Sequence, residues 1–472
     1  MSEQRFVFGV NGLDRMLMGV LDPPSMLVIA GHPGAGKTTL ASSICYANAL
    51  KGFKCLYISF QEDKEKLYKN MKNLNIDLER IEFQGNLKFA RFPVALSVDD
   101  VVLEISNLIL SYNPRLIIVD SMNVFLSGLV GNEVKRAWLQ NYFYELSKQI
   151  NGVVVLVSEL PFGEERLQLG AIEFIADAIL ILKHRVERGL LIRSLEIRKI
   201  RGAPLHVAEV PFMIVEGVGL YVQPMEIPLM IPSEATELDV VCSELKKVIR
   251  SVRLGEIAYV SYPPDARIVE IGIAPVLLAF AIANNLKIMI ISFKYSAETF
   301  RNIFVEQIIN LGIEKDIATK IVDEYVEFIG INPFAVPPGY YPTPSLQRPV
   351  YIDVVVFHGP EARYISMKYR DYITRFFDVI TRLKSERKLN ITLAARISKK
   401  QYNSDTSFSD VVIKIGFTKN GKAYIKVWRK GGNIYKLTIN EIETCYSEVA
   451  EKIKTKALEI RQKVVNQKQT NQ

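Results

Sequence analysis

The sequence is poor in the residues that build metal sites and disulfide scaffolds. Its 472 residues include four cysteines and four histidines. No two cysteines stand in C-x-x-C spacing and none has a histidine beside it, so the pattern predicts neither a zinc site nor a disulfide framework. Unpaired thiols are typical of the cytoplasm, where we expect the protein to reside. The cysteines are Cys45, Cys55, Cys242 and Cys445.

Long apolar runs are missing as well. The longest, from Ile271 to Ala283, contains Pro275 and is shorter than the roughly 18 residues of a membrane-spanning helix. The first residues are polar and no apolar core of a signal peptide follows them. We therefore expect no intrinsic membrane segment, and a buried helix at the apolar run.

No long block of one charge is present either. The formal net charge is +8, but lysine and arginine are dispersed, so charge alone does not predict a nucleic-acid partner. Only residues 452–468 are locally basic, and Ile453, Ala457 and Ile460 recur there at helical spacing. This pattern predicts an amphipathic C-terminal helix that packs on a second domain. Docking of a protein partner on this helix is the alternative.

What the chain does contain is a phosphate-binding loop. Residues 31–38 read G-H-P-G-A-G-K-T and follow an apolar strand-like stretch, which matches the Walker A pattern G-x-x-x-x-G-K-[ST]. The glycines let backbone N–H groups face the phosphates, and the helix that follows adds its positive end. We expect Lys37 to reach the β- and γ-phosphates of ATP. The expected nucleotide contacts are Gly31, His32, Pro33, Gly34, Ala35, Gly36, Lys37, Thr38 and Thr39.

Polar residues follow three further apolar runs. Asp120 ends the run 116–120, an arrangement that places a carboxylate on the Mg²⁺ shell, and the hydroxyl of Thr38 is the other expected Mg²⁺ ligand. Gln61 and Glu62 follow a run that ends at Phe60, where carboxylates can face a nucleotide. Ser158 and Glu159 follow the third run and are weaker candidates for sensing the γ-phosphate.

Strands that alternate with helices predict an α/β fold with a mostly parallel sheet, with the ligand at the carboxyl ends of the strands. Together with Gly12-Leu13-Asp14, the segment 59–62 and Ile118-Val119-Asp120-Ser121, these motifs resemble the KaiC-like ATPases of the RecA superfamily. The resemblance implies a RecA-like P-loop domain that uses ATP and Mg²⁺.

The most specific match is Lys199-Ile200-Arg201-Gly202. In KaiC-like proteins a K-x-R-G stretch reaches the nucleotide of the neighbouring subunit. The resemblance therefore implies that Lys199 and Arg201 act in trans, within a ring of six copies. Without the resemblance, surface ion pairs of small energetic weight would be the simpler reading of these two residues.

One position departs from the family. KaiC-like proteins usually carry two glutamates after the second strand, and the first is the expected general base. This chain has Gln61 there, followed by Glu62. An amide cannot accept a proton from water, so either hydrolysis is slow or Glu62 takes over as the base.

The second half of the chain repeats the order of elements without the nucleotide chemistry. The stretch 261–267 has no G-K-[ST] and carries Pro263 and Pro264, which lack N–H donors. His358 stands where the magnesium aspartate would be, and Trp428 and Lys430 stand where the lysine and arginine of the K-x-R-G stretch would be. We expect a degenerate RecA-like domain, or pseudo-ATPase. The expected segments are the ATPase domain 1–223, a linker 224–236, the degenerate domain 237–440, and a C-terminal helix and tail 441–472.

Two features of the second half have no assigned role. Thr406 and Ser407 lie near where the clock protein of the family is phosphorylated, but helix capping and turn polarity account for them. The proline-rich segment 333–349 predicts an extended loop.

The favoured function is a slowly hydrolysing regulatory or scaffolding ATPase whose nucleotide state controls the binding of a protein partner. One alternative is a recombinase-like, DNA-handling ATPase. It is second because the segment 159–165 is acidic where phosphate binding would require lysine or arginine. Another alternative is an ATP-binding accessory subunit of an archaeal motility or pilus machine.

Overall fold

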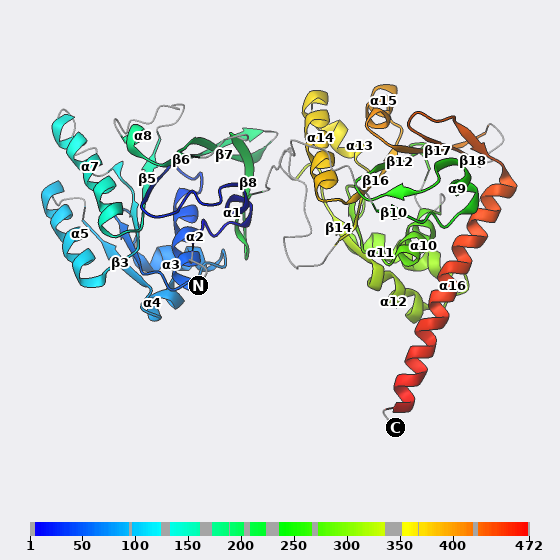
Figure 1. The fold of residues 1–472 in the computed structure, drawn as a ribbon, viewed down its shortest axis with the longest axis horizontal. Coiled ribbons are helices and arrows are strands. Elements are labelled where there is room, and N and C mark those ends of the chain that lie inside the picture. The colour runs from blue at the N-terminus through cyan, green and yellow to red at the C-terminus, as the bar shows by residue number, and fades with distance from the viewer. Residues whose placement is uncertain are drawn as a thin grey trace. The chain divides into compact units, whose positions relative to one another are not determined.

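The computed structural model describes residues 5–93, 97–123, 133–160, 172–187, 189–202, 208–222, 236–266, 272–335, 352–366, 368–418 and 423–470. The chain folds into two compact units, Met1–Glu226 and Ile227–Gln472, and each is described by itself (Figure 1). The segment 161–171, most of the expected linker and most of the proline-rich segment lie outside the described residues.

The first unit contains a nine-stranded sheet in the order β3-β2-β4-β5-β1-β6-β7-β8-β9. The strands from β3 to β6 in this order are parallel, and β6 to β9 form an antiparallel extension. The strands are β1 (Ser25–Gly31), β2 (Cys55–Ser59), β3 (Leu87–Arg91), β4 (Leu116–Asp120), β5 (Val153–Glu159), β6 (Ala178–Glu187), β7 (Leu190–Ile200), β8 (Glu209–Val215) and β9 (Gly219–Val222).

Helices cover both faces of this sheet, because the central strands are apolar on both sides. One face packs against α2 and α3 through side chains such as Leu40 and Leu67, and the other packs against α5 and α7 through Ile105 and Phe143. Figure 1 shows α5 and α7 in cyan on the opposite side of the sheet from α2. The helices are α1 (Asn11–Met16), α2 (Lys37–Leu50), α3 (Lys64–Lys72), α4 (Leu78–Phe83), α5 (Val98–Tyr112), α7 (Glu133–Gln149) and α8 (Ile172–Ile175).

The second unit contains an eight-stranded sheet in the order β14-β13-β15-β16-β12-β17-β18-β19, and a two-stranded sheet of β10 and β11. The strands are β10 (Glu237–Leu238), β11 (Val252–Arg253), β12 (Ile257–Tyr262), β13 (Ile288–Ser292), β14 (Val326–Gly330), β15 (Val354–His358), β16 (Leu389–Ala395), β17 (Val411–Phe417), β18 (Ala423–Arg429) and β19 (Tyr435–Leu437). The helices are α9 (Ser243–Ile249), α10 (Ile273–Asn284), α11 (Ala297–Ile309), α12 (Lys315–Tyr325), α13 (Glu361–Ser366), α14 (Tyr369–Ser385), α15 (Lys399–Ser407) and α16 (Ile439–Thr470).

The two sheets have the same topology. The order from β3 to β8 in the first corresponds strand by strand to the order from β14 to β19 in the second. The antiparallel part of the sheet begins at β6 in the first unit and at its counterpart β17 in the second. The predicted fold class, two RecA-like α/β domains plus a C-terminal helix, is confirmed.

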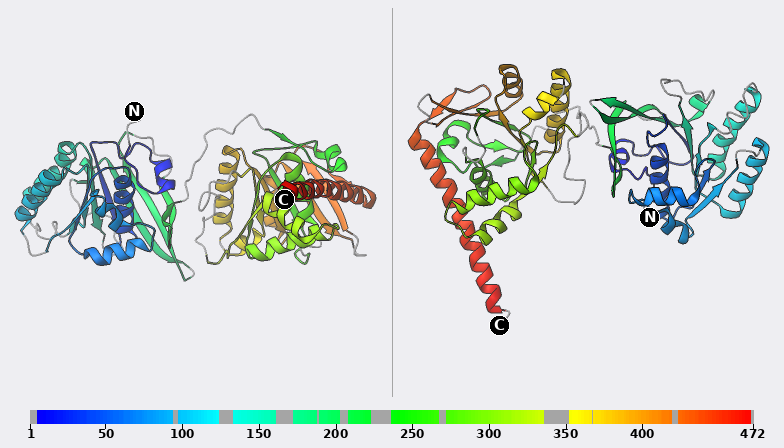
Figure 2. Two further views of the ribbon diagram at one scale, coloured as in Figure 1. Left: turned by 90° about the horizontal axis from the view of Figure 1, so that it is seen from below. Right: turned by 180° about the vertical axis from the view of Figure 1, so that it is seen from behind.

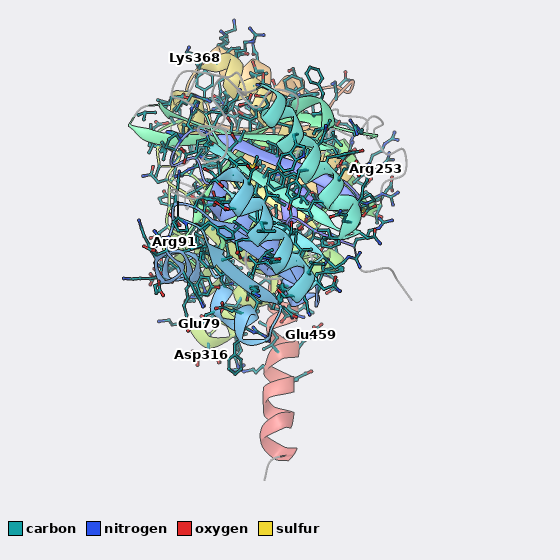
Figure 3. The ribbon with its side chains drawn as sticks, turned by 90° about the vertical axis from the view of Figure 1, so that its left-hand side faces the viewer. Glu79, Arg91, Arg253, Asp316, Lys368 and Glu459 are labelled. Atoms are coloured by element: carbon teal, nitrogen blue, oxygen red, sulfur yellow. A yellow bond between two sulfur atoms is a disulfide. The ribbon has the colours of Figure 1, made fainter. Side chains whose placement is uncertain are left out.

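Helix α16 packs on the second unit through one apolar face. Val449, Ile453 and Ala457 are buried in the main core of this unit. Figures 1 and 2 show the last turns of α16, in red, extending beyond α12. Charged side chains of both units, such as those labelled in Figure 3, are exposed at the surface.

The expectation that no cysteines pair is wrong for one pair. Cys242, just before α9, and Cys445, in α16, form a disulfide, with Cα atoms 4.7 Å apart. Because the two are separated by 203 positions, only the packing of α16 beside α9 brings them together, and local spacing carries no signal of it. Cys45 and Cys55 are free and buried.

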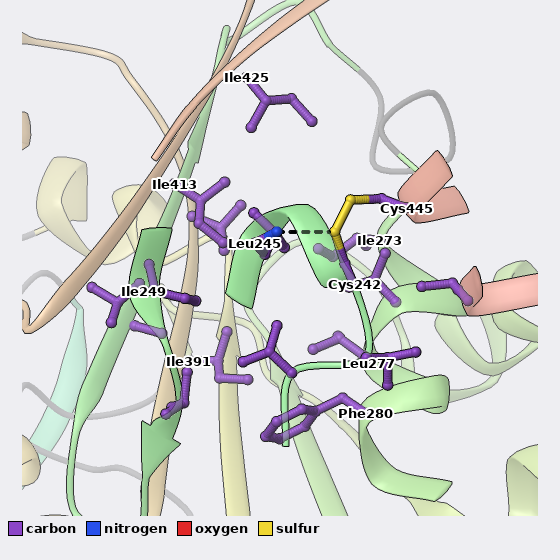
Figure 4. A pocket seen from close by; sticks show the side chains of 18 of the residues that line it. Cys242, Leu245, Ile249, Ile273, Leu277, Phe280, Ile391, Ile413, Ile425 and Cys445 are labelled. Carbon is purple, nitrogen blue, oxygen red and sulfur yellow. Dashed lines mark hydrogen bonds between the residues drawn. A yellow bond between two sulfur atoms is a disulfide. The ribbon is translucent and has the colours of Figure 1, made fainter. Parts of the chain in front are cut away.

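An apolar cavity of about 210 Å³ lies beside this disulfide, between the sheet and α9, α10 and α16. Figure 4 shows Leu245, Leu277 and Phe280 around it, with the sulfur–sulfur bond at one side. Among the described residues, no helix combines the length and apolar character needed to cross a membrane.

Candidate functional site

The loop between β1 and α2 has the backbone that its glycines permit. Gly34 and Gly36 have φ values of 75° and 104°, a region that a β-carbon disfavours. A Cβ on Gly36 would also lie 2.7 Å from Cδ1 of Ile214. Helix α2 begins at Lys37, immediately after Gly36, so its unpaired N–H groups point into the loop. The result is a concave backbone site for an anion at the end of β1.

Lys37 is buried beneath this loop. Its side chain is 7% exposed, and Nζ donates a hydrogen bond to the carbonyl oxygen of His32 at 3.0 Å. Burial lowers the pKa of Lys37, and the nearby charges of Glu159 and Asp120 oppose this shift. A cation with so little solvent around it interacts strongly with any anion that enters the loop.

Asp120, at the end of β4, forms the polar centre of the site. Its Oδ2 accepts hydrogen bonds from Oγ1 of Thr38 and from the hydroxyl of Tyr57, both at 2.9 Å. Burial raises the pKa of Asp120, while these two hydrogen bonds and the charge of Lys37 lower it. Sequence reasoning missed Tyr57, because an aromatic residue within an apolar strand is usually core. Its hydroxyl is the only hint of a polar partner.

The residues after β2 differ in their environment. Ser59 holds the turn there: its Oγ accepts from the backbone N–H of Glu62 at 3.1 Å and donates to the carbonyl of Glu62 at 2.9 Å. Gln61 is exposed and Glu62 is half-buried. Burial, and secondly the charge of Asp120, raise the pKa of Glu62. Of the two candidates, the carboxylate of Glu62 is therefore the one in electrostatic contact with the Asp120 centre.

The end of β5 completes this edge of the sheet. Gly31 and Glu159 pair across β1 and β5. Asn123, which sequence reasoning did not single out, accepts from the N–H of Glu159 at 2.7 Å and donates to its carbonyl at 3.1 Å. Ser158 Oγ also donates to Asn123, at 3.2 Å. The amide therefore ties the Asp120 strand to the Glu159 strand.

Lys199 and Arg201 lie at the opposite edge of the sheet. Lys199 Nζ and Arg201 Nη2 each donate to the carbonyl of Phe174 at 2.9 Å, and the N–H of Arg201 donates to the carbonyl of Asp177 at 2.7 Å. Asp177 in turn is hydrogen-bonded to Met26, at the start of β1. At about 3.3 Å per residue, the start of β1 is roughly 16 Å from its end at Gly31. The structure thus brings the loop, Asp120 and Glu62 together and separates Lys199 and Arg201 from them.

Equivalent positions in the second unit follow from matching hydrogen bonds. The N–H of Phe60 donates to the carbonyl of Asp120 at 3.0 Å, and that of Phe293 donates to the carbonyl of His358 at 2.9 Å. The N–H of Lys430 donates to the carbonyl of Asp410 at 2.8 Å, as that of Arg201 does to Asp177. His358 therefore occupies the place of Asp120, and Lys430 the place of Arg201.

At this place the second unit is closed by its own side chains. His358 is 1% exposed, its Nδ1 lies 2.9 Å from Oγ of Ser292, and the ring of Tyr295 stacks on it at 5.4 Å between centroids. Burial lowers the pKa of His358 to about 3, so the ring is neutral. Lys294, in the place of Gln61, forms an ion pair with the buried Glu361.

Comparison with known proteins identifies the first unit. Residues 7–227 match the family model "ATPase: KaiC". Over 203 residues, 43% of this chain, the sequence is 26% identical to the circadian clock oscillator protein KaiC of Parathermosynechococcus lividus and to that of Picosynechococcus sp.. The matched regions cover only 38% and 39% of those two relatives. Over residues 7–227 the chain is therefore similar to the ATPase domain of the KaiC family.

Proposed function

We propose that the first unit binds ATP with Mg²⁺ and hydrolyses it slowly, within a ring of six copies in which each copy completes its neighbour's site. The observation that carries the proposal is the separation of Lys199 and Arg201 from their own phosphate loop. Two cations that match the family's K-x-R-G stretch lie at the wrong edge of the sheet to serve their own site.

The loop side of the site fits ATP. Backbone N–H groups of residues 34–39 would face the phosphates, Lys37 would neutralise the β- and γ-phosphates, and the N-terminus of α2 would add its dipole. Asp120 and Lys37 are within electrostatic range of one another. The negative charge of the triphosphate would therefore interact with a lysine that burial keeps poorly solvated.

The donor set also fits Mg²⁺. Neighbouring ligands of an octahedral ion at 2.0–2.1 Å lie about 2.9 Å apart, and Thr38 Oγ1 and Asp120 Oδ2 are separated by 2.9 Å. Thr38 and Asp120 would hold the ion, and Tyr57 orients the carboxylate from behind. When bound, Mg²⁺ neutralises charge on the β- and γ-phosphate oxygens.

Glu62 is the base that we propose for the attacking water. Its raised pKa makes it a stronger proton acceptor than an ordinary surface carboxylate. Gln61 is solvent-exposed and can orient water but not accept its proton. We infer slow turnover, because one carboxylate stands where the family usually has two.

Lys199 and Arg201 supply the missing charge in trans. A cation delivered across an interface stabilises charge on the γ-phosphate, a contribution of roughly 10³–10⁵ in rate where it has been measured for arginine fingers. Release of both side chains from the carbonyl of Phe174, and of Arg201 from its ion pair with Asp177 at 3.3 Å, would make them available to the neighbour. Hydrolysis then depends on assembly.

Beyond hydrolysis, we propose that nucleotide state sets the binding of a protein partner, through the second unit or α16, in the cytoplasm. Support comes from the closed second site, since a unit that cannot bind ATP by the usual loop is kept for assembly or contacts. Helix α10 begins with Ile273 in the place of Lys37.

Complementation of two inactive variants tests the arrangement. Lys37→Ala removes the loop lysine and Arg201→Ala removes the cation in trans, so each variant alone should lose at least about 10³ of the ATPase rate. Mixed in equal amounts, they should form sites that pair an intact loop with an intact neighbour, about a quarter of all sites in a closed ring. Arg198→Ala, one strand position from Lys199 and paired with Glu196, is the matched control.

Light scattering with ATP and Mg²⁺ follows assembly in the same samples. Recovery of activity in the mixture supports a site shared between copies. Full activity of Arg201→Ala alone contradicts it. Assembly without turnover in the wild type would instead assign the protein to nucleotide-gated scaffolding.

A further inference from the structure

The outer strands of the second unit carry a row of lysines that the linear sequence does not reveal. Lys414 on β17 pairs with Lys426 on β18, which pairs with Lys436 on β19. Residues directly opposite one another in an antiparallel sheet point to the same face. We call these three residues the lysine row. Their spacing along the chain is 12 and 10 positions, so only the strand register brings them together.

No acidic residue balances the row within these strands. Residues 411–437 contain six lysines, one arginine and no aspartate or glutamate. Within the part of the chain that the structure describes, no carboxylate forms an ion pair with a member of the row. Lys414 and Lys426 are half-buried and Lys436 is exposed. Like charges directly opposite in a sheet destabilise it, so the arrangement costs the fold some electrostatic repulsion.

The equivalent row of the first unit carries no lysine, and two of its three positions are glutamates. There Ile181 on β6 pairs with Glu196 on β7, which pairs with Glu209 on β8. Glu196 holds Lys183 at 2.6 Å and Arg198 at 2.7 Å. The second unit has lysine at every position of this row. Two glutamates, of which Glu196 is neutralised by its own neighbours, are thus replaced by lysines.

Aromatic side chains alternate with the lysines on the same face. The Lys426 and Lys436 ammonium groups lie 6.0 and 5.6 Å from the ring of Tyr424, and that of Lys414 lies 5.1 Å from the ring of Tyr402 on α15. Tyr424 and Tyr402 are half-buried, which leaves part of each ring open. Figure 1 shows β17 and β18 next to α15.

We propose that this face of β17, β18 and β19 binds single-stranded nucleic acid. The lysine row would contact successive phosphates, and the ring of Tyr424, between two lysines, would stack on a base. Basic grooves with aromatic platforms bind single strands with little sequence preference. An acidic protein surface would need the charges but not the aromatic rings. The proposal does not depend on the ATPase activity of the first unit.

The test uses the full chain and fluorescein-labelled oligo(dT) and oligo(U), followed by anisotropy between roughly 50 and 200 mM salt. The variant is Lys414→Gln, Lys426→Gln and Lys436→Gln together. This variant should bind at least about tenfold more weakly than the wild type. The slope of log affinity against log salt should decrease in magnitude by about 2, the value expected for the loss of three phosphate contacts with a single strand.

A matched control removes the same charge elsewhere on the second unit. Lys315, Lys320 and Lys452 are exposed on α12 and α16, and their combined change to Gln should alter the affinity by less than about twofold. A variant with all three lysines of the row changed to Arg should keep the affinity of the wild type. This result would show that substitution at these positions does not disrupt the fold. An equal loss in the control, or no binding by the wild type, overturns the proposal.

An abasic strand of the same length separates nucleic acid from a general polyanion. Oligo(dT) should bind at least about fivefold more tightly than the abasic strand, and Tyr424→Leu should remove that difference while it leaves the salt slope unchanged. Equal binding of the two strands by the wild type contradicts base stacking and would assign the face to anions in general.

Discussion

The ends of β4 in the first unit and of β15 in the second occupy equivalent positions but carry different side chains. Asp120 is a half-buried carboxylate stabilised by Thr38, Tyr57 and the charge of Lys37. His358 is buried and neutral, with Ser292 at its Nδ1. A buried anion is costly unless it is paired, so a cation that entered with a ligand would stabilise the first site. The second site is satisfied without one.

The same contrast extends to the outer strands. The first unit neutralises Glu196 with its own Lys183 and Arg198, whereas the second leaves the lysine row without carboxylates. The first unit therefore has its charges balanced on the outer strands but not at the end of β4, and the second unit shows the reverse. The same strand order and backbone hydrogen bonds support both arrangements. The side chains alone decide which charges are left without an opposite charge nearby.

The largest expected effect concerns the turn after β2. Glu62→Gln should lower the ATPase rate by roughly 10²–10⁴, since a general base contributes about that much. Because burial and the charge of Asp120 raise the pKa of Glu62, the wild-type rate should fall as the pH drops through that raised pKa. Gln61→Glu should increase the rate. The measurement is steady-state ATPase activity against pH.

The control is the equivalent position in the second unit. Tyr295 has the place of Glu62, as shown by its N–H donating to Ser292 at 2.9 Å. Tyr295→Phe should leave the ATPase rate unchanged. A wild-type rate in Glu62→Gln, or an equal loss in Tyr295→Phe, would remove the distinction between the two turns.

The next effect concerns a buried carboxyl of the second unit. Asp405 is 1% exposed and accepts hydrogen bonds from Gln401 at 2.5 Å, Tyr259 at 3.2 Å and Tyr372 at 3.4 Å. Burial, reinforced by the charge of Glu361, raises its pKa to about 7 against the opposing effect of these hydrogen bonds. The folded state therefore holds a proton more tightly than the unfolded state does, and this contribution to stability is lost as the pH rises through 7.

Asp405→Asn should remove this dependence. Between about pH 5.5 and about pH 8, the free energy of unfolding of the wild type should fall relative to that of the variant by on the order of 2 kcal/mol. His358 titrates in the opposite sense, since its folded pKa is lowered, but its contribution cancels in the difference. Urea unfolding can be followed by Trp428 fluorescence in a Trp138→Phe background, which leaves one tryptophan, in the second unit. A constant difference would contradict the shifted pKa.

Local sequence predicts the parts of the first site that are contiguous. The loop 31–39, Asp120 at a strand end and the repeated order of elements are all read along the chain, and the confirmed α/β fold follows from them. The assignment of Trp428 and Lys430 to the places of Lys199 and Arg201 agrees with the hydrogen bond from Lys430 to Asp410. Thr406 and Ser407 bond back to carbonyls of α15.

What sequence reasoning missed depends on distant pairing. Tyr57 reaches Asp120 across 63 positions, and Cys242 reaches Cys445 across 203. The lysine row looked like dispersed charge because its members are set together only by strand register. Register is decided by packing of the opposite, apolar face, which a count of charges cannot show.

The smallest expected effect tests the charge reversal in the absence of any ligand. Changing the lysine row to Gln should raise the free energy of unfolding of the second unit by up to about 1 kcal/mol, because it removes like charges that face one another. Glu196→Gln in the first unit should lower stability, since Lys183 and Arg198 lose their carboxylate. Both effects should shrink at about 1 M salt, where the Debye length is about 3 Å. The Trp428 readout reports the first change and Trp138, in a Trp428→Phe background, the second. If the variant of the lysine row is less stable than the wild type, the lysines stabilise the fold. Their presence would then no longer indicate that an external anion binds there.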